Sequence, residues 1–151
     1  MHSEFRRVAI LGRYDDPHVA EPMTALVMHL AEAGIEVFAA DEMSLDLAVT
    51  RVAENKLAAN ADLMIAIGGD GTMLYAGNLA GEREIPLLGI NRGRLGFLAD
   101  VSPDEMIASV DYILAGDYSC ESRLMLSATL QTMDGQTVTA TALNDVVLQR
   151  R

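Results

Sequence analysis

The stretch "IAIGGDGTML" (residues 65–74) joins two apolar runs through three glycines, an aspartate and a threonine. A buried strand that ends in glycines and is followed at once by a helix is typical of open sheets whose ligands bind at the carboxyl ends of the strands. Gly68, Gly69 and Gly71 allow positive φ angles and a close approach of backbone N–H groups to a ligand. A helix that begins near Thr72 would add its unpaired N–H groups and positive dipole end. The stretch therefore predicts a phosphate site.

Asp70 is the residue of this turn that a phosphate site does not explain, because a carboxylate repels an anion. The turn also lacks the G-x-G-x-x-G spacing of dinucleotide sites and the Gly-Lys of a P-loop. Asp70 can be a turn former that accepts backbone N–H bonds. It can equally accept a proton from a hydroxyl that attacks phosphorus, or help to hold a divalent cation. Thr72 is a candidate helix cap or hydroxyl donor. The residues alone leave these interpretations open.

Strand and helix patterns alternate on both sides of this turn. The apolar runs predict strands at 7–11, 35–40, 62–67 and 86–90, and helices at 19–33, about 72–80 and 103–116. Ser102, Pro103 and Glu105 predict a capping box with a proline at the start of the last helix. Residues 41–60 fit either a helix or irregular structure. Continuous apolar strands that alternate with helices indicate an α/β fold with a Rossmann-like parallel sheet covered on both faces.

The pattern changes after residue 118. In "RLMLSATLQTMDGQTVTATALNDVVLQ" (123–149), two strand-like runs flank Asp134-Gly135, which predicts a β-hairpin. We therefore predict an α/β domain at 1–118 and the beginning of an all-β domain at 119–151. A two-stranded hairpin is marginal alone, so we expect the chain to be the amino-terminal part of a longer protein.

Composition excludes several classes of function. The formal net charge is −11 and Lys56 is the only lysine, so a nucleic-acid partner is not expected. An anionic ligand must instead be held by arginines, a metal ion or backbone N–H groups. Cys120 is the only cysteine, which excludes a disulfide framework within the chain. No segment approaches the ~18 apolar residues of a membrane span, so we expect no membrane partner and a cytoplasmic location.

Three motifs carry a resemblance to a known family. "GGDGT" (68–72) resembles the signature shared by NAD kinases, diacylglycerol and sphingosine kinases, and phosphofructokinases. "GINRGRLGFLAD" (89–100) resembles the second conserved block of NAD kinases, and "ALNDVVLQR" (142–150) resembles their Asn-acidic motif. Lipid kinases normally have a "GTxND"-like element after the fourth strand, where this chain has "NRGRLGF". The chain thus resembles the NAD kinase family over nearly its whole length.

The resemblance implies a phosphofructokinase-like domain and a phosphoryl transfer. The phosphoryl group of ATP or polyphosphate would pass to the 2′-hydroxyl of the adenosine ribose of NAD, giving NADP, with Mg²⁺ as the expected divalent ion and no protein metal site. Asp70 would be the proton acceptor and, with Gly71, a contact to NAD. Asn144 and Asp145 match the family's NAD-binding pair. The phosphate-proximal turn would comprise Gly68, Gly69, Gly71 and Thr72. A homo-oligomer, dimer or tetramer, is expected at full length.

The chain departs from the family pattern in two ways. Asp145 stands where the family often has glutamate, and the "TPTGSTAY"-like β segment of NAD kinases is absent. We therefore expect the 151-residue chain alone to be inactive or nearly so. A lipid kinase and a non-catalytic dinucleotide-binding module are the alternatives. Arg92 and Arg94 follow a predicted strand, where they can contact phosphate or lie on a solvated loop.

Overall fold

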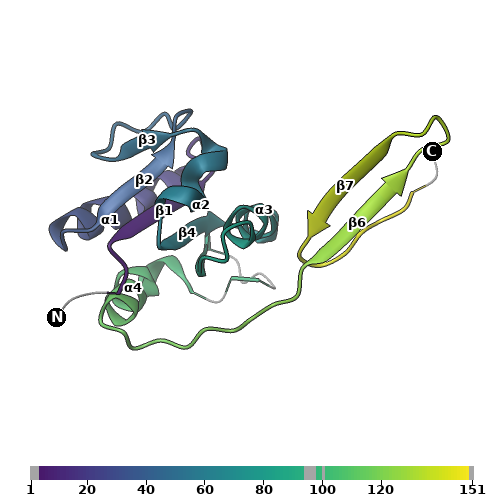
Figure 1. Ribbon diagram of the computed structural model, residues 1–151. Coiled ribbons are helices and arrows are strands. Elements are labelled where there is room, and N and C mark those ends of the chain that lie inside the picture. Colours follow the sequence, from purple (N-terminus) through teal and green to yellow (C-terminus); the bar gives the residue numbers. More distant parts are fainter. Residues whose placement is uncertain (1–3, 94–97, 100, 150–151) are drawn as a thin grey trace. The chain divides into compact units, whose positions relative to one another are not determined.

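The computed structural model describes residues 4–93, 98–99 and 101–149. The chain divides into two compact units, Met1–Cys120 and Glu121–Arg151. The first unit contains a sheet and its covering helices, and the second is a β-hairpin (Figure 1). No helix among the described residues has the length and apolar character needed to cross a membrane.

The first unit is built on a parallel sheet with the strand order β3-β2-β1-β4-β5. Figure 1 labels β1 to β4 of this sheet. Its strands are β1 (Arg7–Gly12), β2 (Glu36–Ala40), β3 (Thr50–Val52), β4 (Leu63–Gly68) and β5 (Leu87–Asn91). From β1 the chain builds outward through β2 and β3, then returns to place β4 and β5 on the other side of β1. The boundary between β1 and β4 is therefore the topological switch point, where ligands of such sheets bind. The predicted α/β fold is confirmed.

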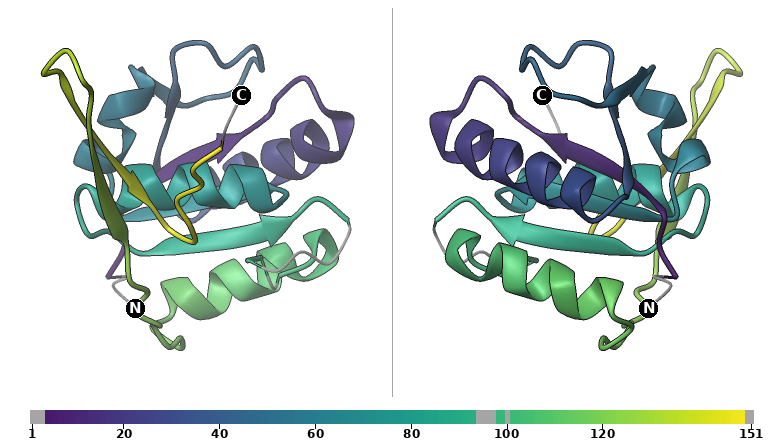
Figure 2. Two further views of the ribbon diagram at one scale, coloured as in Figure 1. Left: turned by 90° about the vertical axis from the view of Figure 1, so that its right-hand side faces the viewer. Right: turned by 90° about the vertical axis from the view of Figure 1, so that its left-hand side faces the viewer.

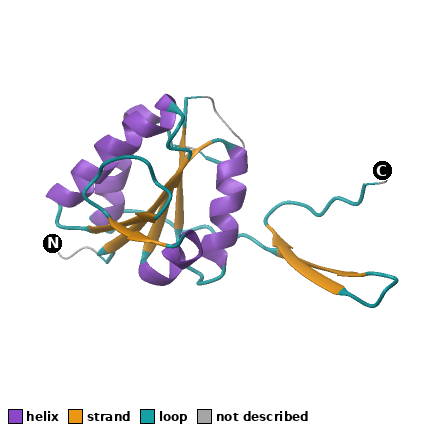
Figure 3. Cartoon of the chain, turned by 90° about the horizontal axis from the view of Figure 1, so that it is seen from above, coloured by secondary structure: helices purple, strands orange, loops and turns teal. Residues whose placement is uncertain are grey.

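Helices cover both faces of the sheet (Figure 3). They are α1 (Pro17–Glu32), α2 (Leu57–Asn60), α3 (Asp70–Gly81) and α4 (Met106–Leu114), with 3-10 turns η1 (Glu54–Lys56) and η2 (Pro103–Glu105) before α2 and α4. Figure 2 shows α1 (purple) and α4 (green) from two opposite sides. These two helices share one face of the sheet, where His29 Nε2 and Asp111 Oδ1 lie 2.6 Å apart.

The sheet separates two apolar clusters because successive side chains of a strand point to opposite faces. On one face, Ile10 and Ile65 pack with Met23 of α1 and Val110 of α4. On the other face, small strand residues such as Ala9 and Ala66 pack against α2 and α3; the helix residues of this second cluster are Leu57, Ala58, Met73, Ala76 and Ala80. A strand buried on both faces needs a continuous apolar sequence, which explains the uninterrupted runs in β1 and β4.

Several boundaries differ from the sequence predictions. α1 begins at Pro17, two residues early, because Asp16 caps it by accepting the backbone N–H of His18 at 3.0 Å. Residues 41–60, which the sequence left undecided, contain β3, η1 and α2. These elements have three, three and four residues, too few for an apolar period to be recognised.

The predicted capping box before α4 is not formed. The Ser102 hydroxyl donates to Glu105 Oε2 at 2.8 Å, so both side chains bind each other instead of the backbone N–H groups. The first turn, Pro103–Glu105, is a 3-10 turn without a side-chain cap. The proline position is as predicted.

The second unit confirms the predicted hairpin. Strands β6 (Leu126–Gln131) and β7 (Thr137–Ala142) are antiparallel and pair residue for residue. Gly135 in the connecting loop has φ 85°, a left-handed conformation that favours glycine. The loop is closed by the Thr132 backbone N–H, which donates to the Gln136 carbonyl at 2.8 Å.

Candidate active site

The glycine turn lies beside the switch point of the sheet. β4 ends at Gly68, Gly69 is the N-cap of α3 with φ −98° and ψ −171°, and Asp70 is the first helical residue. α3 therefore begins two residues before the predicted start, and Thr72 is not its cap but part of its first turn. The positive dipole end of this 12-residue helix opens at the carboxyl edge of the sheet.

The expectation of positive φ angles in this turn is wrong. Among the described residues, the glycines with positive φ are Gly34, Gly93, Gly116 and Gly135. Gly68 is needed for a different reason, because a Cβ atom there would lie 2.4 Å from Thr72 Oγ1 and 2.7 Å from Thr72 Cβ. Gly68 thus lets the first turn of α3 fold back closely over the end of β4.

Gly69 and Gly71 have open space in front of them. A Cβ atom on Gly71 would meet nothing within 4 Å, and one on Gly69 would first meet Arg92 Nε at 4.0 Å. Both glycines line a pocket of about 460 Å³ at the ends of β1 and β4. Small-molecule sites typically measure about 300–1,000 Å³. The bare backbone expected from the sequence therefore does face a cavity of ligand size.

Residues from several elements surround this cavity, which we call the switch-point pocket. Its lining comprises Leu11, Gly12, Arg13, Glu54, Gly69, Gly71, Thr72, Tyr75 and Arg92. A smaller hollow of about 310 Å³ lies at the ends of β1 and β2. The two cavities share Gly12, Arg13 and Glu54, so they adjoin one another along the carboxyl edge of the sheet.

Arg92 brings positive charge to the switch-point pocket from the end of β5. Its backbone N–H donates to the Gly68 carbonyl at 3.2 Å, and its Nη1 donates to Asp16 Oδ2 at 2.9 Å. The pKa of the Asp16 carboxyl is lowered mainly by its hydrogen bond with the backbone N–H of His18. The hydrogen bond with the His18 side chain and the charge of the Arg92 guanidinium lower this pKa further. Arg92 is therefore tethered at the pocket from both its backbone and its side chain. Arg94, the other candidate arginine, lies outside the described residues.

A tyrosine and a glutamate form another part of the lining. The Tyr75 hydroxyl of α3 donates a hydrogen bond to Glu54 Oε1 of η1. This bond, together with partial burial and the Glu54 charge, raises the pKa of Tyr75 to about 12. Neither residue was predicted from the sequence. Tyr75 lies four residues after Gly71 and therefore on the same side of the helix, so its position could have identified it as a site residue. Glu54 lies within residues 41–60, where the sequence predicted no definite element, and no pattern pointed to it.

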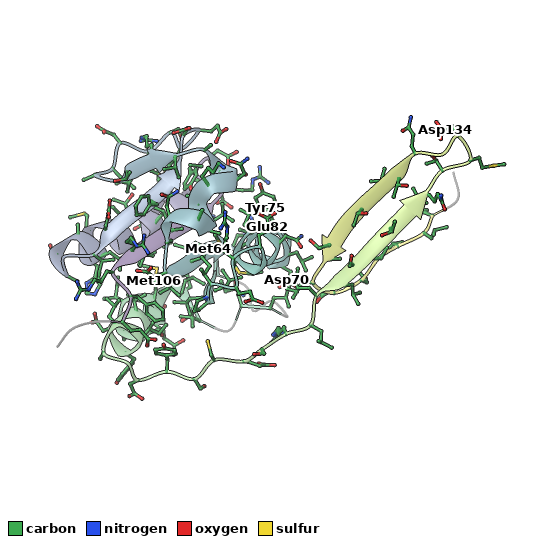
Figure 4. All side chains as sticks on the ribbon, viewed as in Figure 1. Met64, Asp70, Tyr75, Glu82, Met106 and Asp134 are labelled. Carbon is green, nitrogen blue, oxygen red and sulfur yellow. The ribbon has the colours of Figure 1, made fainter. Side chains whose placement is uncertain are left out.

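Asp70 occupies a different side of the α3 N-terminus. Its Oδ1 accepts the backbone N–H of Leu98 at 3.1 Å, and its carboxylate complements the positive end of the helix dipole. Asp70 is not among the residues that line the switch-point pocket, although Tyr75 of the same helix is. Figure 4 labels both side chains. The carboxylate therefore accepts a backbone N–H, as a turn former does, from a residue 28 positions along the chain.

The other predicted site residues belong to the second unit. Asn144 and Asp145 follow β7, and both are exposed. The structure thus gathers Gly68, Gly69, Asp70, Gly71 and Thr72 at one helix end, while the predicted roles of Asn144 and Asp145 stay predictions.

The described residues of this site include no cage of carboxylates for a metal ion. Within residues 4–93, 98–99 and 101–149, no group of three or more His, Cys, Asp or Glu side chains has the arrangement to hold a metal ion. A divalent ion that is shared with a phosphate ligand needs fewer, since Mg²⁺ is commonly bound through one or two carboxylates, waters and the phosphates themselves.

Comparison with known proteins connects this site to a family. A family model of the ATP-NAD kinase N-terminal domain matches residues 8–118. The chain is 36% identical over 149 residues to the NAD kinase of Geobacter sp. (strain M21), which covers 96% of this chain and 52% of that protein. It is 40% identical over 149 residues to the NAD kinase of Saccharophagus degradans, with 97% and 51% covered. The chain thus spans about half the length of these curated relatives.

A solved structure confirms the fold. The crystal structure of yeast NADH kinase complexed with NADH aligns with a TM-score of 0.82 at 21% identity, covering 92% of this chain and 44% of that one. The sequence relatives are NAD kinases and the family model describes the same group, so a place among the lipid kinases is not supported. With the family model matching most of its length, this chain belongs to the NAD kinase family.

Proposed function

We propose that the protein containing this chain is an NAD kinase, which transfers a phosphoryl group from ATP or polyphosphate to the 2′-hydroxyl of the adenosine ribose of NAD. The observation that carries the proposal is the switch-point pocket, in which the open backbone of Gly69 and Gly71 at a helix N-terminus lies with Arg92. This combination is suited to a chain of phosphates. Membership of the NAD kinase family supports the choice of acceptor.

The chain's residues divide the reaction between two sides of the α3 N-terminus. On the pocket side, Gly69, Gly71 and Arg92 bind and orient the donor phosphates and balance their negative charge. On the other side, Asp70 takes the proton of the attacking 2′-hydroxyl. The new bond joins the ribose oxygen to phosphorus, while the bond from phosphorus to the donor's bridging oxygen breaks. Positioning and charge neutralisation supply most of the catalysis in such transfers.

The expected Mg²⁺ fits this site as a companion of the donor. Mg²⁺ usually keeps several waters and is bound through one or two carboxylates and the phosphates of the substrate, so phosphate oxygens and water would be its main ligands here. When bound, it would neutralise phosphate charge. The chain's own contribution would be to hold the phosphates through the backbone of Gly69 and Gly71 and through Arg92.

The remaining parts of the proposal concern the acceptor and the surroundings of the enzyme. Asn144 and Asp145 are proposed to contact NAD from the second unit, on the strength of the Asn-acidic motif. We propose a cytoplasmic homo-oligomer, a dimer or tetramer, that has neither nucleic acid nor a membrane as a partner. The net charge of −11 supports the absence of nucleic acid.

The test is NADP formation by the longest natural form of the protein, purified and supplied with NAD, Mg²⁺ and either ATP or polyphosphate. We expect NADP from at least one donor, and no phosphorylation of diacylglycerol or sphingosine. The 151-residue chain in the same assay should form little or no NADP. Tight binding of NAD by the natural protein without any NADP would favour a non-catalytic dinucleotide-binding module.

A further inference from the structure

The lining of the switch-point pocket contains groups that attract phosphate and groups that do not. Its phosphate-binding part comprises the open backbone of Gly69 and Gly71 and the guanidinium of Arg92. Another part of its lining comprises Glu54 and Tyr75, which are joined by a hydrogen bond. An inorganic polyphosphate carries negative charge along its whole length, whereas a nucleoside triphosphate carries charge at one end and a neutral base and sugar at the other. The two donor classes therefore make different demands on this pocket.

The cavity beyond Glu54 is acidic. The adjoining hollow of about 310 Å³ is lined by Asp15, Glu42 and Glu54. Its arginine, Arg13, lies 3.5 Å from Asp15 (Nη2 to Oδ2) in an exposed pair, so three carboxylates face one guanidinium in this hollow. A phosphate chain that extended past Glu54 would meet like charges, which repel it. A neutral sugar with hydroxyl donors would instead find carboxylate oxygens that accept hydrogen bonds.

Tyr75 offers a surface for a base. Its side chain is 47% exposed, and its hydroxyl is fixed at the ring's far end by Glu54. The same contact is the main cause that raises the pKa of Tyr75 to about 12. An aromatic ring held in place at a pocket wall is suited to stacking on a nucleobase, because every base presents an aromatic face. The second oxygen of the Glu54 carboxylate can accept a hydrogen bond from the same ligand.

We propose that Glu54 and Tyr75 are specificity-determining residues of the donor site, which bind the nucleoside part of a nucleoside triphosphate and exclude inorganic polyphosphate. This inference rests on the proposed kinase function. Beyond that function, it predicts which of the two donors the enzyme uses. The preference would come from the hydrogen-bonded pair of Tyr75 on α3 and Glu54 on η1.

The experiment compares donors in the longest natural form of the protein, with NAD saturating. Wild type should use ATP at least tenfold more efficiently than tripolyphosphate or long-chain polyphosphate, as kcat/KM. Tyr75→Ala should raise the KM for ATP about tenfold, the loss of one base–aromatic stack, with little change in kcat. Glu54→Gln keeps the side-chain volume but removes the charge, and should raise the kcat/KM for polyphosphate. Tyr75→Phe keeps the ring and should retain most of the ATP preference.

Tyr112→Ala is the matched control, since Tyr112 is 61% exposed on α4 and does not line either described pocket. It should leave both donors unaffected. A wild type that uses polyphosphate as well as ATP would overturn the inference, as would variants of Glu54 and Tyr75 that change both donors equally. Those results would leave the kinase function intact. A wild type that forms no NADP from any donor would instead overturn both proposals.

Discussion

Gly68 and Gly71 lie on either side of the first residue of α3, and a methyl group added to each would meet different surroundings. At Gly68 it would overlap Thr72, whose Oγ1 would be 2.4 Å away, whereas at Gly71 it would meet nothing within 4 Å. Gly68 is therefore a packing requirement, and Gly71 is an opening toward the pocket. The residues that form the turn could be predicted from the sequence. Their φ angles and separate roles depend on where the Thr72 side chain lies in the folded chain, and no local sequence pattern indicates that position.

Gly68→Ala should lower the free energy of unfolding by about 1–3 kcal/mol, the usual cost of forcing an extra carbon into a packed site. Gly71→Ala is the matched control. It places alanine in a helical position with free space, and should keep or raise stability by about 0.4–1 kcal/mol. Urea unfolding followed by circular dichroism measures both. Equal stability of the two variants would contradict the packing role of Gly68.

Asp62 joins the amino-terminal ends of β1 and β4 at the scale of the elements. Its Oδ2 accepts the backbone N–H groups of Arg6 at 3.2 Å and Arg7 at 3.1 Å, and its Oδ1 accepts from Arg7 Nη2 at 2.6 Å. The side-chain bond to Arg7 is the main cause that lowers the pKa of the Asp62 carboxyl. The contact fixes the register of β1 and β4 at their amino-terminal ends, which lie opposite the pocket.

Asp62→Asn should reduce stability at neutral pH by about 0.5–1 kcal/mol, a modest value because the pair is accessible to solvent. The pKa is lowered in the folded state, so the stabilisation is present above the unfolded-state pKa of about 3.9 and is lost as the pH falls through the folded-state pKa. The stability difference between wild type and variant should therefore shrink in acid below about pH 4. Urea titrations at several pH values measure it, and a difference that grows in acid would show that the ion pair is not its source.

Element length decided how much of the fold could be predicted. β1, β4 and α1 have six, six and 16 residues, so their apolar patterns are long enough to be recognised, and the parallel α/β sheet follows from them. β3, η1 and α2 are too short for a pattern. Glu54 lies within this unreadable segment, so the sequence could not place it at the pocket. Arg92 was found because it directly follows a recognisable strand.

The two units of the molecule differ in how their apolar side chains are buried. Both apolar clusters are made only of residues from the first unit. In the second unit, Leu126, Ala128 and Leu130 pair with apolar residues of β7, while the alternate positions of β6 hold Ser127, Thr129 and Gln131. The ribbon thus has one apolar and one polar face. A sequence motif can identify Asn144 and Asp145 as site candidates, but their distance from Asp70 depends on how the two units are placed.

Residues 1–120 alone should fold cooperatively with nearly the same urea midpoint as the 151-residue chain, because that piece contains both clusters. Circular dichroism at a helix-sensitive wavelength compares the two chains. A midpoint that drops well below that of the longer chain would show that the hairpin stabilises the sheet domain.

The role proposed for Asp70 is to accept the proton of the attacking hydroxyl beside a donor pocket that Asp70 does not line. Its most direct test is Asp70→Asn in the longest natural form of the protein, assayed for NADP formation with NAD, ATP and Mg²⁺. The substitution keeps the side-chain shape and an oxygen for the Leu98 N–H, but removes the base. We expect a kcat about 10²–10⁴-fold lower than that of wild type, with NAD and ATP binding largely retained. A kcat close to that of wild type would contradict it.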